Sequence, residues 1–105
     1  MSEEARKLDH DKIPFELLPS AALGDIANIF GFGSKKYSPR NWELGMQWSR
    51  MYGALQRHLN AWWSGENTDP ETGKSHLHHA GCCLLMLIEY EKHYPEKDDR
   101  TNLKK

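Results

Sequence analysis

The sequence predicts an all-α protein, a small bundle of three main helices with a short N-terminal segment. Apolar residues recur at helical spacing in two segments, and a third segment is almost continuously apolar. Clusters of Gly, Pro, Ser and Asn separate the three segments. Because only 38% of the 105 residues are hydrophobic, burial against a second copy is attractive, and we expect a homo-oligomer to complete the bundle.

The first helix is expected to begin near Pro19, since proline suits the opening position of a helix. Four apolar residues then repeat at helical spacing: Leu23, Ile26, Ala27 and Phe30. Gly31 and Gly33 are expected to end this helix. The stretch that follows, SKKYSPRNWELG, is rich in turn-forming residues and is expected to be a loop.

The second helix is expected at about residues 48–64, closed by Gly65. Its apolar stripe consists of Met51, Leu55, Leu59 and Trp62. The third helix is expected at about residues 75–93. From Ala80 to Ile88 it is apolar on every side, which predicts a central helix of the fold or of an oligomer interface.

Length predicts one all-α domain over residues 1–105, with a core at about 12–94. The segments 1–11 and 95–105 are charged and are expected to be mobile tails. The formal charge of -1 argues against a nucleic acid polymer as partner. The charged start lacks the apolar centre of a signal peptide and no apolar run could cross a bilayer, so we expect a cytoplasmic protein without a membrane partner.

Three histidines have the spacing of a metal site. His58 falls on the apolar stripe of the second helix, while His76 and His79 share one face at the start of the third. Neutral imidazoles at that spacing can converge on one ion. The alternatives are a hydrogen-bonded core histidine at position 58 and solvent-exposed histidines in the first turn of the third helix.

The loop between these two helices supplies carboxylates. Glu66, Asp69 and Glu71 lie between Gly65 and Gly73, and carboxylates are the natural ligands of Mg²⁺ and Mn²⁺, which bind phosphate oxygens. An ordinary acidic surface loop is the alternative. The candidate ligands of a divalent metal, Mg²⁺ or Mn²⁺, are His58, Glu66, Asp69, His76 and His79.

Cationic and aromatic residues favour the binding of phosphates and of a base. The segment KKYSPRNW combines positive charges with ring faces, and Arg57 offers a second guanidinium fork. The candidate substrate-binding residues are Lys35, Lys36, Tyr37, Arg40, Asn41, Trp42, Arg57 and Trp62. A solvated loop is the alternative for the lysines, and core packing is the alternative for Trp48 and Trp62 and the expectation for Trp63.

The segments LLP, FGSKKYSPRNWELG, RHLNAWWSGE and DPETGKSHLHHA resemble the MazZ-type dATP/dGTP diphosphohydrolases of phages and bacteria, relatives of the MazG-like all-α nucleotide pyrophosphohydrolases. The resemblance extends from Asp11 to Glu91. It implies a helical dimer or tetramer, in the host cytoplasm if phage-encoded, that uses a divalent metal to cleave purine deoxynucleoside triphosphates into monophosphate and pyrophosphate. MazG-like enzymes hold metals with E-x-x-E and E-x-x-D pairs; the matching positions here read RHLNAWW and HLHH.

The expected function is therefore that of a metal-dependent nucleoside triphosphate pyrophosphohydrolase, with His58, Asp69 and His79 as catalytic residues. His79 can act as a metal ligand or as a general base, and the sequence does not separate the two roles. Two alternatives stay open. One is a nucleotide-binding protein on the same scaffold that does not hydrolyse its ligand, and the other is a structural oligomer whose histidines bind zinc or satisfy a buried network.

Overall fold

The structure is a computed structural model that describes residues 4–101. Within that range lie three α-helices: α1 (Ser20–Lys36), α2 (Trp48–Trp63) and α3 (His76–His93). Three short 3-10 helices accompany them: η1 (Phe15–Leu17), η2 (Asn41–Leu44) and η3 (Pro95–Lys97). No strand occurs among the described residues, so the all-α prediction is confirmed. Residues 1–3 and 102–105, parts of the expected tails, lie outside the described range.

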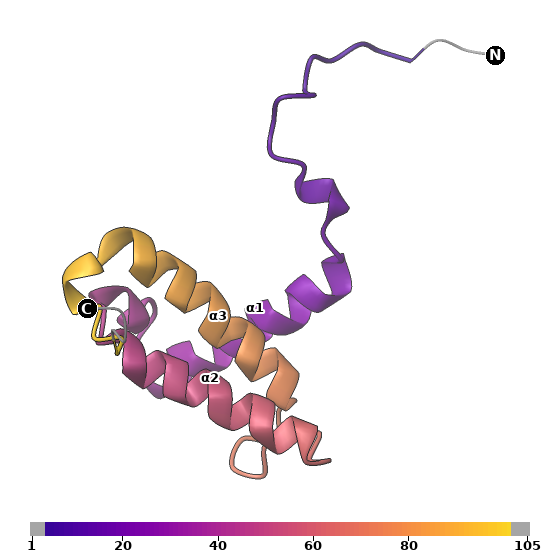
Figure 1. The fold of residues 1–105 in the computed structure, drawn as a ribbon. Coiled ribbons are helices and arrows are strands. Elements are labelled where there is room, and N and C mark those ends of the chain that lie inside the picture. Colours follow the sequence, from indigo (N-terminus) through magenta and orange to yellow (C-terminus); the bar gives the residue numbers. More distant parts are fainter. Residues whose placement is uncertain (1–3, 102–105) are drawn as a thin grey trace.

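The helices α2 and α3 run in opposite directions and pack side by side, while α1 crosses behind α3 (Figure 1). The segment before α1 extends away from this body (Figure 1). The long loop between α2 and α3 closes one end of the helix pair. This arrangement places the end of α2 next to the beginning of α3.

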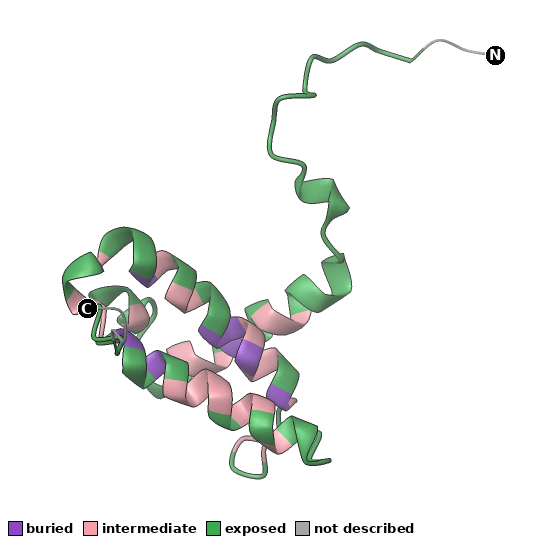
Figure 2. Ribbon diagram, in the orientation of Figure 1, coloured by how far each residue is buried: buried purple, intermediate pink, exposed green. Residues whose placement is uncertain are grey.

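The core lies where α2 and α3 face each other (Figure 2). Its buried members are Trp48, Met51, Cys83 and Tyr90. The Tyr90 hydroxyl donates to the carbonyl oxygen of Trp42 at 2.6 Å, and Trp48 Nε1 donates to the carbonyl oxygen of Tyr94 at 3.1 Å. Both bonds satisfy polar groups of buried side chains. The first ties the η2 segment to the core, and the second ties the end of α3 to the start of α2.

The end of α1 differs from the sequence prediction. The helix continues through Gly31 and Gly33 to Lys36, and the backbone N–H of Tyr37 donates to the carbonyl oxygen of Gly33 at 3.0 Å. Glycine inside a helix costs only about 1 kcal/mol relative to alanine, and packing of α1 against α3 offsets this. Lys35 and Lys36 therefore belong to the last turn of α1, where their charges suit the helix dipole.

The buried face of α1 was also predicted incompletely. Its one buried residue among those described is Ile29, which is not one of the four apolar residues expected to repeat along this helix. Two of those four, Leu23 and Ala27, are exposed. Ile26 packs against α3 so closely that a Cβ atom added to Gly81 would lie 2.7 Å from Ile26 Cδ1. The contact with α3, and not the internal period of α1, decides which side is buried.

The second and third helices agree with the prediction at both ends. Gly65 follows α2 with a positive φ of 103°, and the Ser75 side chain caps α3 by accepting a hydrogen bond from the backbone N–H of Leu77.

Two expectations of burial are wrong for the single chain. Trp63, at the last position of α2, is 82% exposed, and α3 is not buried on every side, because α1 and α2 cover only part of it.

Candidate metal centre

The loop between α2 and α3 folds back across the helix ends. Gly65 and Gly73 have φ values of +103° and +74°, a region that glycine adopts without steric cost. The backbone N–H of Asp69 donates to the carbonyl oxygen of Lys74 at 2.8 Å, which closes the turn. The sequence at these positions therefore brings Asp69 to the side of the histidines.

Three side chains converge at this point. His58 Nδ1, from α2, lies 2.9 Å from His76 Nδ1, from the first turn of α3. His58, Asp69 and His76 each offer one ligand atom, and these three atoms lie within 4.8 Å of one another. Two imidazole nitrogens and a carboxylate oxygen at such distances form a group that can hold a divalent metal.

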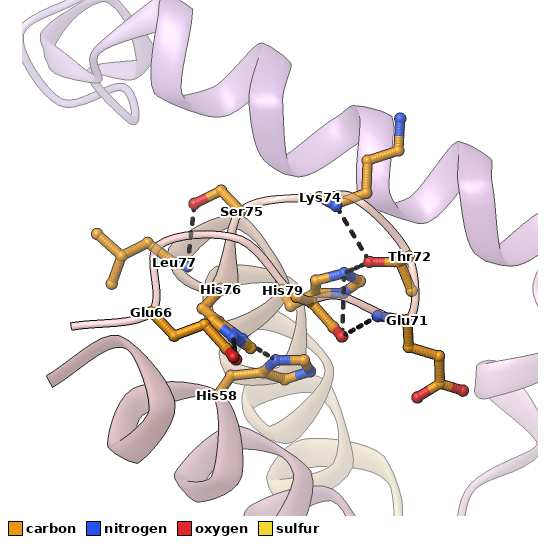
Figure 3. A network of polar contacts seen from close by, with 10 residues as sticks. His58, Glu66, Glu71, Thr72, Lys74, Ser75, His76, Leu77 and His79 are labelled. Atoms are coloured by element: carbon orange, nitrogen blue, oxygen red, sulfur yellow. Dashed lines mark hydrogen bonds and ion pairs between the residues drawn. The ribbon is translucent and has the colours of Figure 1, made fainter. Parts of the chain in front are cut away.

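Glu66 contacts one of these histidines from its outer side. His76 is only 4% exposed, and its Nε2 lies 2.6 Å from Glu66 Oε1 (Figure 3). Glu66 does not belong to the group of converging ligand atoms, although the sequence made it a candidate ligand.

His79 lies beside the three converging side chains. Its ring stacks on that of His58, with centroids 4.5 Å apart and planes at 5°. His79 Nε2 lies 2.8 Å from Thr72 Oγ1 (Figure 3). It lies 4.0 Å from Asp69 Oδ2. Thr72 was not a candidate from the sequence, because a threonine in a polar turn does not indicate which residue it will contact in the folded chain.

Burial lowers the pKa of both His58 and His79. For His58 the neighbouring His79 lowers the pKa further, and Asp69 opposes the shift by raising it. For His79 the main opposing influence is also Asp69. Both rings are therefore biased towards the neutral form, which is the form that binds a metal or accepts a proton.

The nearby thiols are poor candidates for ligands or nucleophiles. Burial, with a smaller effect from Cys83, raises the pKa of Cys82 to about 12. Burial raises the pKa of Cys83 as well. Since the thiolate is the reactive form, both thiols are packing residues near neutral pH.

An open cleft of about 1460 Å³ connects this cluster with the end of α1, the η2 segment and α2. Four residues of the cluster line it: His58, Asp69, His76 and His79. Six of the eight candidate substrate-binding residues also line it: Lys36, Tyr37, Arg40, Asn41, Trp42 and Arg57. Lys35 and Trp62 do not line this cleft, because Lys35 points to solvent from the last turn of α1 and Trp62 lies in the last turn of α2.

The ring of Trp42 packs against other aromatic rings as well as lining the cleft. It lies 5.8 Å from the Phe30 ring and 6.2 Å from the Tyr90 ring.

The two arginines of the cleft have different surroundings. Arg40, at a positive φ of 62°, pairs with Glu43 at 2.5 Å. Arg57 lies along α2 so that a Cβ atom on Gly53 would stand 3.1 Å from its Nη1.

Comparison with known protein families matches residues 2–100 to the family described as "dATP/dGTP diphosphohydrolase, N-terminal". The chain belongs to this family. A curated protein named dATP/dGTP diphosphohydrolase, from Salmonella phage PMBT28, is 30% identical over 94 residues. The alignment covers 90% of this chain and 32% of the relative, so the chain spans about a third of the relative's length.

The resemblance stated from the sequence motifs is thus confirmed, and the match to this diphosphohydrolase family covers nearly the whole chain. No solved structure matches the chain. Among the described residues, no helix has the length and apolar character needed to span a membrane.

Proposed function

We propose that this chain is a metal-dependent pyrophosphohydrolase domain that converts purine deoxynucleoside triphosphates into monophosphate and pyrophosphate. Family membership and the name of the phage relative support the reaction and the substrates. The observation that carries the proposal is the convergence of His58, Asp69 and His76 in a cleft that Arg57 and Lys36 also line.

The donor set favours one of the two expected ions. Mg²⁺ prefers oxygen ligands, whereas imidazole nitrogens suit first-row transition ions. Two histidines and one aspartate therefore favour Mn²⁺ over Mg²⁺. When bound, the metal would polarise a phosphoryl oxygen and lower the pKa of a water molecule.

His79 is the residue we propose as general base. Burial holds its pKa below the usual value, so the ring is neutral near pH 7. Its Nε2 would take a proton from the water that attacks the α-phosphorus, and pyrophosphate would leave. The carboxylate of Asp69, 4.0 Å from this nitrogen, would then stabilise the imidazolium.

The remaining cleft residues would hold the nucleotide. Lys36, Arg40 and Arg57 would neutralise the triphosphate, with the guanidinium groups offering paired N–H donors. Tyr37 and Asn41 would contact the base, the first through its exposed ring and the second through its amide.

The test is an assay of pyrophosphate release from dATP and dGTP with Mn²⁺ or Mg²⁺. We expect activity in the unmodified chain and a loss of at least about a hundredfold in His58→Ala, the effect expected when a residue that holds the metal is removed. The matched control is His93→Ala, which removes an exposed histidine of α3 that does not line the cleft. Equal activity of the two variants would contradict the assignment of the site.

A second function is a nucleotide-binding domain that does not hydrolyse its ligand. It is favoured by the single carboxylate among the three converging ligands and by the relative's length, since further groups can lie elsewhere in a longer protein. Tight binding of dATP with the ligand recovered intact, with and without Mn²⁺, would decide for this function.

We also propose a homo-oligomer, a dimer or tetramer in the cytoplasm, assembled through α3. Leu84, Leu85 and Ile88 are 50%, 40% and 42% exposed in the single chain, although they belong to the apolar run of α3 from Ala80 to Ile88. Exposed apolar side chains gathered on one helix are typical of an interface.

A further inference from the structure

Among the described residues, the side chain of Glu66 makes one polar contact, and it is with a histidine. Its Oε1 lies 2.6 Å from His76 Nε2, while its side chain is about half exposed at the rim of the site. The converging ligand atoms belong to His58, Asp69 and His76. Glu66 therefore stands behind His76, on the opposite side of the imidazole ring from His58.

The contact with Glu66 determines which nitrogen of His76 carries the proton. An ionised carboxylate can only accept hydrogen bonds, so the nitrogen facing Glu66 must carry the proton. A neutral His76 then has its lone pair on Nδ1. That atom is the one that lies 2.9 Å from His58 Nδ1, at the centre of the cluster.

We propose that Glu66 is a positioning residue, which fixes the tautomer and ring orientation of His76 so that Nδ1 is presented as the ligand atom. The inference rests on the metal site of the proposed function and replaces the expectation that Glu66 itself ligates the metal. Carboxylates that accept from the distal N–H of a ligating histidine fix the ring and raise its basicity.

Because His76 is buried, its contact with Glu66 controls the orientation and tautomer of the ring. With Glu66 in place the ring is 4% exposed, so Glu66 accepts the Nε2 proton and shields it from exchange with water. Without an acceptor at Nε2, the ring is free to rotate or to exchange tautomers, and either change turns the lone pair away from His58.

Metal affinity without nucleotide tests the proposal. We would titrate the metal-free chain with Mn²⁺ and with Zn²⁺ in a calorimeter and compare Glu66→Ala, Glu66→Gln and Glu71→Ala. Loss of such a contact typically weakens metal affinity by about 10–100-fold, which is the loss expected for Glu66→Ala. Glutamine keeps an acceptor oxygen for the Nε2 proton, so Glu66→Gln should lie closer to the unmodified chain than to the alanine variant.

The control variant, Glu71→Ala, removes the same charge from the same loop. Its backbone N–H bonds to Asp69, but none of the side-chain contacts in the described structure joins its carboxylate to a histidine. Its metal affinity should match that of the unmodified chain. An equal loss of metal affinity in Glu71→Ala and Glu66→Ala would show that the negative charge of the loop causes the effect, and it would overturn the proposal.

Nitrogen-15 NMR of the metal-free chain supplies a readout that does not depend on metal or activity. We expect His76 in the Nε2–H tautomer, with a slowly exchanging Nε2 proton that Glu66→Ala makes exchange rapidly. Finding the Nδ1–H tautomer would overturn the proposal. So would a loss of metal affinity in Glu66→Gln as great as in Glu66→Ala, because that pattern identifies a direct ligand.

The two proposals fail in different ways. If the unmodified chain binds metal and hydrolyses dGTP while Glu66→Ala keeps full metal affinity, only the role of Glu66 is wrong. If the unmodified chain binds neither Mn²⁺ nor Zn²⁺, the metal site of the proposed function is wrong, and the positioning role is overturned with it.

Discussion

His58 Nδ1 and His76 Nδ1 lie 2.9 Å apart, although the two residues belong to different helices and are 18 positions apart in the sequence. Only one of the two facing nitrogens can carry a proton in this contact, so the other presents a lone pair. A divalent cation satisfies both lone pairs at once and displaces the proton. The pair is therefore the centre of the candidate site.

Replacing His76 by alanine should destabilise the metal-free chain. The change leaves His58 Nδ1 without its partner and opens a gap where a 4% exposed ring was packed. We expect the free energy of unfolding to fall by about 1–3 kcal/mol. Urea denaturation measures this, with His93→Ala as the exposed control; equal midpoints for the two variants would show that the histidine pair does not stabilise the fold.

Acidification should destabilise the chain. The pKa values of His58 and His79 are lowered in the folded state, chiefly by burial, so the unfolded chain binds more protons and stability rises with pH. The contribution is fully present above the usual histidine pKa of about 6.5 and is lost as pH falls through the lowered values. Unfolding measured from pH 7.5 to 5 should give this slope.

A variant with His58→Ala and His79→Ala should show a shallower dependence of unfolding free energy on pH. The charged and titratable neighbours of these rings are His76 and His78 on α3, Asp69 and Lys74 in the loop, and Arg57 on α2. These groups remain in the double variant, so the difference in slope isolates the two histidines. An unchanged slope would assign the acid sensitivity to other groups.

The packing of α1 on α3 leads to a matched pair of glycine predictions. In Gly81→Ala the new Cβ atom would lie 2.7 Å from Ile26 Cδ1, so the Ile26 side chain must leave its packed position and the chain should lose about 1–3 kcal/mol of stability. Gly24 has no atom within 4 Å of such a Cβ, and Gly24→Ala should gain about 0.5–1 kcal/mol. Thermal unfolding of both variants measures the contrast; shifts of the same sign would contradict the close approach.

Sequence reasoning succeeded where a signal was local. The ends of α2 and α3 follow from Gly65 and Ser75, and the shared face of His76 and His79 follows from helical spacing. These two helices also fix the position of His58 relative to the others. The fold class and most of the site could therefore be predicted.

The features that sequence reasoning missed depend on tertiary contacts. The burial of Ile29 and the passage of α1 through two glycines depend on packing against α3. The contact of Glu66 with His76 Nε2 depends on how the loop folds over α3, and no spacing rule specifies that. Trp63 looked like a core residue from its type, yet it stands at the end of α2, where it is 82% exposed.

The exposed apolar side of α3 predicts association in solution. Leu84→Lys and Ile88→Lys together should convert the oligomer into a monomer, because charged side chains would have to lose water at the interface. Light scattering after size-exclusion chromatography measures the mass. Leu44→Lys, on the η2 segment, is the control for an exposed leucine elsewhere. A monomeric unmodified chain would contradict the predicted association.

In the proposed reaction, water attacks the α-phosphorus of a purine deoxynucleoside triphosphate bound in the cleft beside His58, Asp69 and His76. Hydrolysis of dGTP by the unmodified chain with Mn²⁺ in water enriched in oxygen-18 tests it most directly. We expect unlabelled pyrophosphate and one oxygen-18 atom in the phosphate of dGMP. Label in pyrophosphate, release of inorganic phosphate, or dGTP recovered intact would contradict it.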